Sequence, residues 1–328
     1  MKHLYKNMEC RIQIGSVAFD RVHSVVIDST IKKISDTAVI TLPRAFPRTQ
    51  INGKRTSIKE RNITDYIKVG DPVVIRLGYD QNLQEEFRGY VDKIGADHPL
   101  RISCMDAMYL LKKQSFSVAF ESINLKSLLQ YIAPEYEHNI IDTIDLGKFT
   151  IDNKTAFQVL EQLRKDYGLH SFFKEDVLHV AFPISMTPKV THSFVMNKNV
   201  RAVSNSLEFV KKDDVKLLLK AISINDDGKR IFQEFGDKGG VQRTLHFANR
   251  TKEELKKLAQ KNYQSLSFDG YQGTLPGWGE PRTKSGDALQ VTDPAYSERN
   301  GTYLIEGVTI KFNSSDGFLR ENKLGLTL

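Results

Sequence analysis

The pattern of apolar and polar positions over the first 110 residues is typical of short β-strands. Apolar runs rich in Val, Ile and Thr alternate with turn residues such as Pro43, Gly78 and Asp80. The runs cover residues 11–14, 24–28, 37–42, 73–77, 86–94 and 100–104. We therefore expect residues 1–110 to form an antiparallel β-barrel domain.

The period changes to that of helices in the middle of the chain. Apolar residues from Leu125 to Ile132 follow helical spacing after the possible cap Asn124. A second helix is predicted from 156 to 167, with Thr155 and Gln158 as a capping box and Gly168 at its end. A hairpin of residues 169–173 and 177–182 follows. Residues 111–185 are thus predicted to be an inserted small α/β domain.

Strand patterns return between residues 186 and 328, which we expect to form a second β-barrel domain. Thr251 and Glu254 make another capping box, so a helical insertion is predicted at about 251–265. The expected strands are residues 206–210, 215–224, 230–235, 288–291, 301–310 and 320–328. The predicted fold class is α+β, mainly β, with two related antiparallel β-barrel domains and an inserted small α/β domain.

A faint internal repeat supports the idea that the two barrels are related. Gly70-Asp71 and Gly286-Asp287 each lead into a strand, and the next strands begin again at 89–91 and 301–304. Gly-Asp turns before strands are common, so chance similarity stays an alternative at this point.

Positive charge gathers in one segment. The chain has 47 Lys and Arg against 40 Asp and Glu, and the predicted loop 44–68 alone carries seven basic residues against two acids. A solvated loop, a contact with an acidic protein and a contact with nucleic acid all fit this charge; the few aromatics argue against base stacking. The candidate contact residues are Arg44, Arg48, Lys54, Arg55, Lys59 and Arg61.

The only tryptophan, Trp278, lies in a glycine-rich stretch that we expect to be a structured loop. It is either an interface anchor or a lid over the local core.

No pattern for catalysis, metal or cofactor binding assembles in the sequence. The two cysteines, Cys10 and Cys104, lack CxxC spacing, and the chain has no HExxH, GxSxG or phosphate-loop motif. His170 and His179 could approach each other in the predicted hairpin, as ligands or as ordinary sheet residues. Apolar stretches are too short to span a bilayer and no signal peptide is visible, so we expect a cytosolic, reducing site of synthesis.

Several segments together resemble the hub proteins of contractile phage tails. The chain is similar to late-control D-type tail proteins and to the N-terminal hub half of type VI secretion spike proteins. The segments that carry the resemblance are GDPVVI (70–75), FRGYVDKI (87–94), ISCMDAMYLLK (102–112), SGDALQV (285–291) and GTYLIEGV (301–308).

The resemblance implies a non-enzymatic homotrimer in the virion tail baseplate, assembled in the bacterial cytoplasm. Six barrels would ring a channel and join the hexameric tail tube protein to a spike, beside other baseplate proteins. Since the chain stops at Leu328, we expect the spike to be a separate protein. The alternatives are a tail-associated cell-wall hydrolase or peptidase, which needs converging acids, and a nucleic-acid-binding β-barrel protein.

Overall fold

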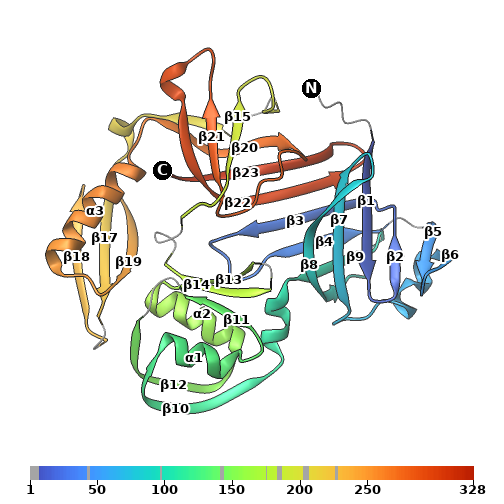
Figure 1. Ribbon diagram of the computed structural model, residues 1–328, viewed down its shortest axis with the longest axis horizontal. Helices are drawn as coiled ribbons and strands as arrows, with labels where there is room; N and C mark the ends of the chain where they lie inside the picture. Colours follow the sequence, from blue (N-terminus) through green and yellow to red (C-terminus); the bar gives the residue numbers. More distant parts are fainter. Residues whose placement is uncertain are drawn as a thin grey trace.

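The computed structural model describes residues 7–42, 45–96, 98–140, 144–174, 176–182, 187–201, 207–225 and 228–328. Figure 1 shows the first and last parts of the chain side by side in one large β body. The middle of the chain forms an α/β unit beside this body. A small unit of three strands and one helix lies at the left of the view. The mainly β, α+β fold predicted from the sequence is confirmed.

The large body is built on one 15-stranded sheet, in which the hydrogen-bonded order is β16-β20-β23-β22-β3-β4-β9-β8-β7-β1-β2-β5-β6, with β15 and β21 joined to β22. Its N-terminal strands are β1 (Met8–Ile14), β2 (Val17–Phe19), β3 (Ser24–Thr30), β4 (Thr37–Thr41), β5 (Ala45–Ile51), β6 (Lys54–Lys59), β7 (Pro72–Tyr79), β8 (Asn82–Ile94) and β9 (Arg101–Met105). Its C-terminal strands are β15 (Thr191–Val195), β16 (Leu207–Val210), β20 (Gly270–Trp278), β21 (Ala288–Thr292), β22 (Gly301–Asn313) and β23 (Gly317–Thr327). Short 3-10 helices are η1 (Glu60–Asp65), η2 (Ala107–Lys112), η4 (Lys212–Asp214) and η5 (Ser297–Arg299).

The two halves of this sheet repeat one strand order. The N-terminal half runs β1-β7-β8-β9-β4-β3, and the C-terminal half runs β15-β21-β22-β23-β20-β16. Each strand has its counterpart at the same place in the chain order. One pairing differs, because β1 is antiparallel to β7 whereas β15 is parallel to β21. We refer to the halves as the N-terminal and C-terminal β units.

The Gly-Asp turns of the two units make the same hydrogen bonds. The Gly70 amide donates to the Val91 carbonyl at 2.8 Å, and the Val91 amide donates to the Asp71 carbonyl at 2.9 Å. In the C-terminal unit, the Gly286 amide donates to the Ile305 carbonyl at 2.9 Å, and the Ile305 amide donates to the Asp287 carbonyl at 2.8 Å. Both glycines have positive φ, 92° and 85°, which favours glycine. The internal repeat in the sequence is therefore also a repeat in the structure.

The same comparison corrects the register of the repeat. Since Val91 is equivalent to Ile305, Gly89 corresponds to Tyr303 and not to Gly301, as the sequence pattern suggested. A β-bulge follows at the equivalent place in both units, at Asp92 in β8 and at Glu306 in β22. A shared bulge is a strong sign of a shared fold, because bulges are specific local features.

Two segments expected to be loops are regular structure. Residues 45–59 form the hairpin β5-β6, and η1 follows it. The turn is Asn52-Gly53, with φ of 48° and 77°, and this dipeptide favours the tight hairpin turn. The glycine-rich stretch is strand β20, where the missing side chain of Gly277 leaves room for the Phe194 ring.

The inserted α/β unit has its own core and confirms the predicted helices and hairpin. Thr155 and Gln158 form the capping box of α2, and Gly168 ends that helix in the left-handed conformation. The elements of the unit are β10 (Ser115–Asn124), α1 (Leu125–Ile132), β11 (Glu137–Ile140), β12 (Asp145–Thr155), α2 (Ala156–Tyr167), β13 (His170–Lys174) and β14 (Val177–Ala181).

The small unit differs from the prediction. Residues 215–224 and 230–235 do form a hairpin, but it lies outside the C-terminal β unit, in a separate three-stranded sheet covered by α3. The helix begins at the predicted Thr251–Glu254 capping box. The elements are β17 (Leu217–Ile224), β18 (Arg230–Gly236), β19 (Val241–Ala248) and α3 (Lys252–Leu266). The predicted domain boundaries at 110 and 185 stay predictions.

One hydrophobic core runs through both β units. Cys10 and Cys104 lie buried in it as free thiols, and burial raises the pKa of each to about 12. None of the helices in the described part of the chain is long and apolar enough to cross a bilayer.

Candidate functional site: the seam between the β units

The two β units are joined by the pairing of β3 with β22, which we call the seam. Seven register pairs run from Thr30 opposite Gly307 to Ser24 opposite Asn313. Side chains reinforce the ladder: Thr309 Oγ1 donates to Asp28 Oδ1 at 3.0 Å. The seam is thus a continuous part of the sheet.

An ion-pair cluster surrounds the bulge residue Glu306 at one end of the seam. The Ile31 amide donates to the Glu306 carbonyl at 3.0 Å, and the Glu306 carboxylate pairs with Lys32 and with Lys323, the latter at 2.8 Å. Burial acts to raise the pKa of Glu306, but the hydrogen bonds from the two lysines outweigh it and hold the pKa below the usual value. Glu306 is therefore a charged anchor at the seam.

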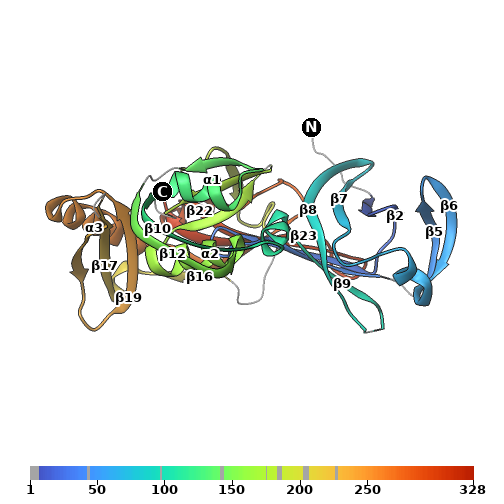
Figure 2. The same ribbon diagram turned by 90° about the horizontal axis from the view of Figure 1, so that it is seen from below.

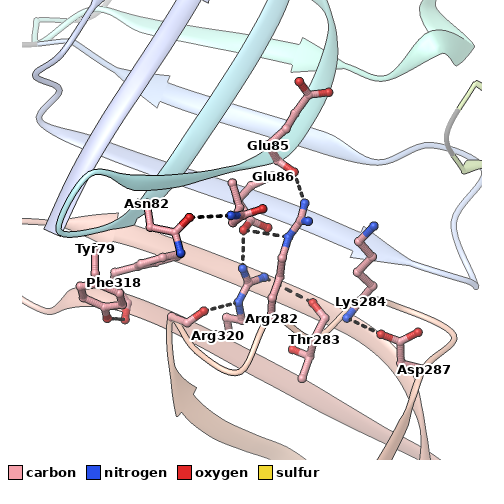
Figure 3. Close-up of polar contacts among 12 residues, drawn as sticks. Tyr79, Asn82, Glu85, Glu86, Arg282, Thr283, Lys284, Asp287, Phe318 and Arg320 are labelled. Carbon is pink, nitrogen blue, oxygen red and sulfur yellow. Dashed lines mark hydrogen bonds and ion pairs between the residues drawn. The ribbon is translucent and has the colours of Figure 1, made fainter. Parts of the chain in front are cut away.

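A second, more deeply buried cluster lies where the β7-β8 hairpin meets the C-terminal unit (Figure 3). Glu86 on β8 accepts a hydrogen bond from Arg320 Nη2 at 2.6 Å and another from Arg282 Nε at 3.2 Å. The side chains of Glu86 and Arg320 are 4% and 1% exposed. Arg282 also donates to the carbonyl of Glu85. Removing Glu86 would leave the buried Arg320 charge uncompensated, whereas Glu86 would keep its pairing with Arg282 if Arg320 were removed.

The rest of the Arg320 guanidinium is satisfied by backbone carbonyls. Its Nε donates to Gly279 at 2.7 Å and its Nη1 to Thr283 at 3.3 Å. Thr283 Oγ1 in turn donates to Asn322 Oδ1 at 2.5 Å. Figure 3 shows these groups linking the 279–287 segment to β23 and β8. The cluster fixes the position of one β unit against the other.

A cavity of about 390 Å³ lies between these charged residues and the inserted unit. Glu86, Arg282 and Lys284 line one side, Asp36 and Asp106 line another, and Phe172 and Phe173 come from β13. No histidine or cysteine lines the cavity among the described residues. No group of three or more potential metal-binding side chains is present in the described part of the chain either.

The acids Asp36 and Asp106 are brought together by the pairing of β4 with β9. Asp106 Oδ2 accepts from the Asp36 amide at 2.9 Å, and its Oδ1 caps η2 by accepting from the Met108 amide at 3.0 Å. Burial raises the pKa of Asp106 to about 8, and the nearby Asp36 charge raises it further. Burial also raises the pKa of Asp36 to about 6, with a smaller contribution from Asp28. No sequence pattern predicts this pair, because 70 residues separate its members and only strand pairing brings them together.

The contact residues proposed from the sequence that fall in β5 and β6 lie away from the seam. Lys54 is exposed at the start of β6, the last strand of the sheet path. Arg44 lies outside the described residues, as do the side chains of Arg48, Arg55, Lys59 and Arg61.

Trp278 ends β20 and is 45% exposed, with the Arg201 guanidinium 5.7 Å from its ring.

His170 and His179 are not register partners. His170 Nδ1 contacts the Ile31 carbonyl at 2.9 Å, and His179 stacks on Phe172. His170 thus contacts the backbone, and His179 packs against an aromatic ring.

No protein-family model matches the chain, and no curated protein matches its sequence. Solved structures do match its fold over nearly its whole length. A tail protein from Neisseria meningitidis has a TM-score of 0.60 at 13% identity and covers 98% of this chain and 97% of its own. The prophage MuSo2 43 kDa tail protein from Shewanella oneidensis has a TM-score of 0.61 at 17% identity, covering 97% and 98%.

The fold also matches part of a longer chain from the Francisella PdpA-VgrG complex. There the TM-score is 0.57 at 10% identity, and the match covers 99% of this chain but 59% of the other. The resemblance to tail-hub proteins is thus confirmed at the level of fold: this chain has the fold of phage tail proteins, which part of a VgrG complex chain shares.

Proposed function

We propose that this protein is a structural subunit of the baseplate hub of a phage tail or a related contractile injection machine. The observation that carries the proposal is the repeated strand order of the two β units, joined by a continuous seam, in a chain with the fold of phage tail proteins. Its place in the particle is the tail baseplate.

In this proposal three chains form a ring. Each chain supplies two related β units, so a trimer presents six similar units around a channel. Such a ring matches a six-fold tube on one side and a three-fold spike on the other. Its partners are the tail tube protein, a separate spike protein and other baseplate proteins.

The proposed role is non-enzymatic. Asp36 and Asp106 are the converging acids that a hydrolase would need, but the contacts of Asp106 assign it another task. Its two oxygens accept backbone amides that hold the start of η2 against the β3-β4 turn. A carboxyl group used as a helix cap stabilises the fold.

The oligomeric state tests the ring. We expect native mass spectrometry to show a homotrimer, for the protein alone or after mixing with the tail tube protein of the same particle. Class averages from electron microscopy should show six similar lobes around a hollow centre. A protein that stays monomeric in both preparations, or that forms rings of another number, would contradict the proposal.

A further inference from the structure

The edge strand of the C-terminal β unit is equivalent to the strand that forms the seam. In the N-terminal unit, Ser103 on β9 pairs with β8 just past the bulge at Asp92, and Val39 on β4 lies opposite Ser103. In the C-terminal unit, Lys323 on β23 pairs with β22 just past the bulge at Glu306, and Thr274 on β20 lies opposite Lys323. Val39 and Thr274 are therefore equivalent. Strand β3 pairs with β4, and β16 pairs with β20, so β16 stands where β3 stands.

The register extends this equivalence to single residues. Ile27 lies opposite Ala38, one residue before Val39, and Leu207 lies opposite Gly273, one residue before Thr274. Residues 207–210 thus correspond to residues 27–30. Those N-terminal residues pair with β22 in the seam, whereas in the described part of the chain β16 pairs with β20 alone.

The β22 side of the seam also has a counterpart, which lies in the N-terminal unit. The seam uses β22 from Gly307 onwards, just past the bulge at Glu306. The equivalent residues in the N-terminal unit are 93–96, at the end of β8 just past the bulge at Asp92. Lys93 and Ala96 in this segment are exposed.

We propose that β16 of one copy of this chain pairs antiparallel with residues 93–96 of a second copy, repeating the seam between chains. The inference rests on the proposed trimer and names the surfaces that close it. The two edges are different surfaces, so the contact is head-to-tail, and such contacts close into a ring when the rotation permits. Figure 2 shows β16 and β8 set apart along the molecule.

Side chains at the equivalent positions complement one another. Within the chain, Lys32 pairs with Glu306 across the seam. Their counterparts are Lys212 and Asp92, which again have opposite charge. Asp92 is half-buried and pairs with Lys112 of its own chain at 3.7 Å, so Lys212 of a neighbouring copy would share this carboxylate. Such a pair would add specificity and register more than affinity.

The proposed contact would also cover an exposed apolar side chain. Ser29 and Ser285 share a hydrogen bond of 2.8 Å across the seam, and their counterparts are Phe209 and Val69. Val69 is 57% exposed in the single chain. Between two copies it would meet Phe209, so an apolar contact replaces the polar one.

Disulfide cross-linking tests the pairing at one register position. Asp28 and Thr309 face each other across the seam with their side chains in contact, and their counterparts are Glu208 and Gly95. We expect the double variant Glu208→Cys/Gly95→Cys to oxidise to covalent trimers that a reductant releases. Cys10 and Cys104 do not compete, because they are buried with strongly raised pKa values.

The control is Glu208→Cys/Asn82→Cys, which places the second thiol at the other end of β8 and should not cross-link. Native mass spectrometry is run on the same samples. Trimers that form without cross-linking would overturn the edge pairing and leave the proposed function standing. A protein without trimers would overturn both.

A charge swap tests the same contact without introduced thiols. Lys212→Asp should reduce the trimer fraction, and Asp92→Lys/Lys212→Asp should restore it. A trimer fraction that neither variant changes would contradict the pairing of these two residues and, with no cross-link, the proposal.

Discussion

Asp106 combines burial, which raises the pKa of its carboxyl to about 8, with backbone hydrogen bonds that act in the other direction. Burial is the larger effect, so the folded protein keeps a proton there that the unfolded chain loses near pH 4. Between those values the folded state binds more protons than the unfolded state, and its stability falls as the pH rises. His246 acts in the opposite sense at lower pH, because burial lowers its pKa from 6.5 to about 4.

The range between about pH 6.5 and 8 lies above the pKa of about 6 of Asp36 and above the range in which His246 changes stability, so the proton on Asp106 dominates there. We expect the unfolding free energy of the wild type to decrease across this range, measured by urea denaturation. Asp106→Asn should remove most of that slope, while Asp65→Asn, at an exposed site, should keep it. An unchanged slope in Asp106→Asn would show that the carboxyl is ionised throughout.

At the scale of elements, the end of α2 is tied to the small three-stranded unit. Gly168 ends α2 with a φ of 73°, and a Cβ there would lie 2.1 Å from His246 Nδ1 on β19. Arg230 on β18 donates to the Asp166 carbonyl at 2.8 Å. Gly168 thus serves two purposes, the left-handed helix end and the close approach of a second unit.

Two glycine substitutions separate these purposes. Gly147→Ala, at a φ of 63° with nothing within 4 Å of the added Cβ, should cost about 1–2 kcal/mol of unfolding free energy from backbone strain alone. Gly168→Ala should cost clearly more because of the clash with His246. In a His246→Ala background the extra cost should disappear. Equal costs for the two single variants in urea denaturation would refute the clash.

Local signals explain which elements the sequence predicts well. The helix caps at Asn124, Thr155 and Thr251 involve residues within one turn, and the structure confirms all three. The turn Asn52-Gly53 is an equally local signal. The loop prediction for residues 44–68 rested on their charge and did not use this turn signal, so it missed the hairpin. Non-local pairing is different in kind: Glu86 and Arg320 are 234 residues apart, so no pattern in the sequence points to their contact. The assignment of β17 and β18 to the wrong sheet has the same cause.

For the whole molecule, the basic hairpin β5-β6 ends the sheet path at the side opposite β16. This position, with the net positive charge of residues 44–68, fits a contact with an acidic neighbour in the particle. Since β6 pairs with β5 alone in the described part of the sheet, charge changes there should leave the fold intact.

Arg55→Glu/Lys59→Glu/Arg61→Glu should weaken assembly with the tail tube or ring partner, measured by co-sedimentation, because it changes the net charge of residues 44–68 from +5 to −1. Lys252→Glu/Lys256→Glu/Lys257→Glu makes the same change of charge on exposed positions of α3 and should not weaken assembly. Unchanged assembly in the hairpin variant would make the segment a solvated extension. A loss of salt-sensitive DNA binding instead would favour a nucleic-acid partner.

The seam also determines how the molecule bears load. Its seven register pairs lie side by side along antiparallel strands, so a force that slides one β unit past the other along the strand direction loads the hydrogen bonds in shear, all at once. A force across the strands would open them one pair at a time, like a zipper. In the proposed tail hub the seam would therefore be strong along β3 and β22 and weak at right angles to them, and the buried Glu86–Arg320 pair braces the units beside it.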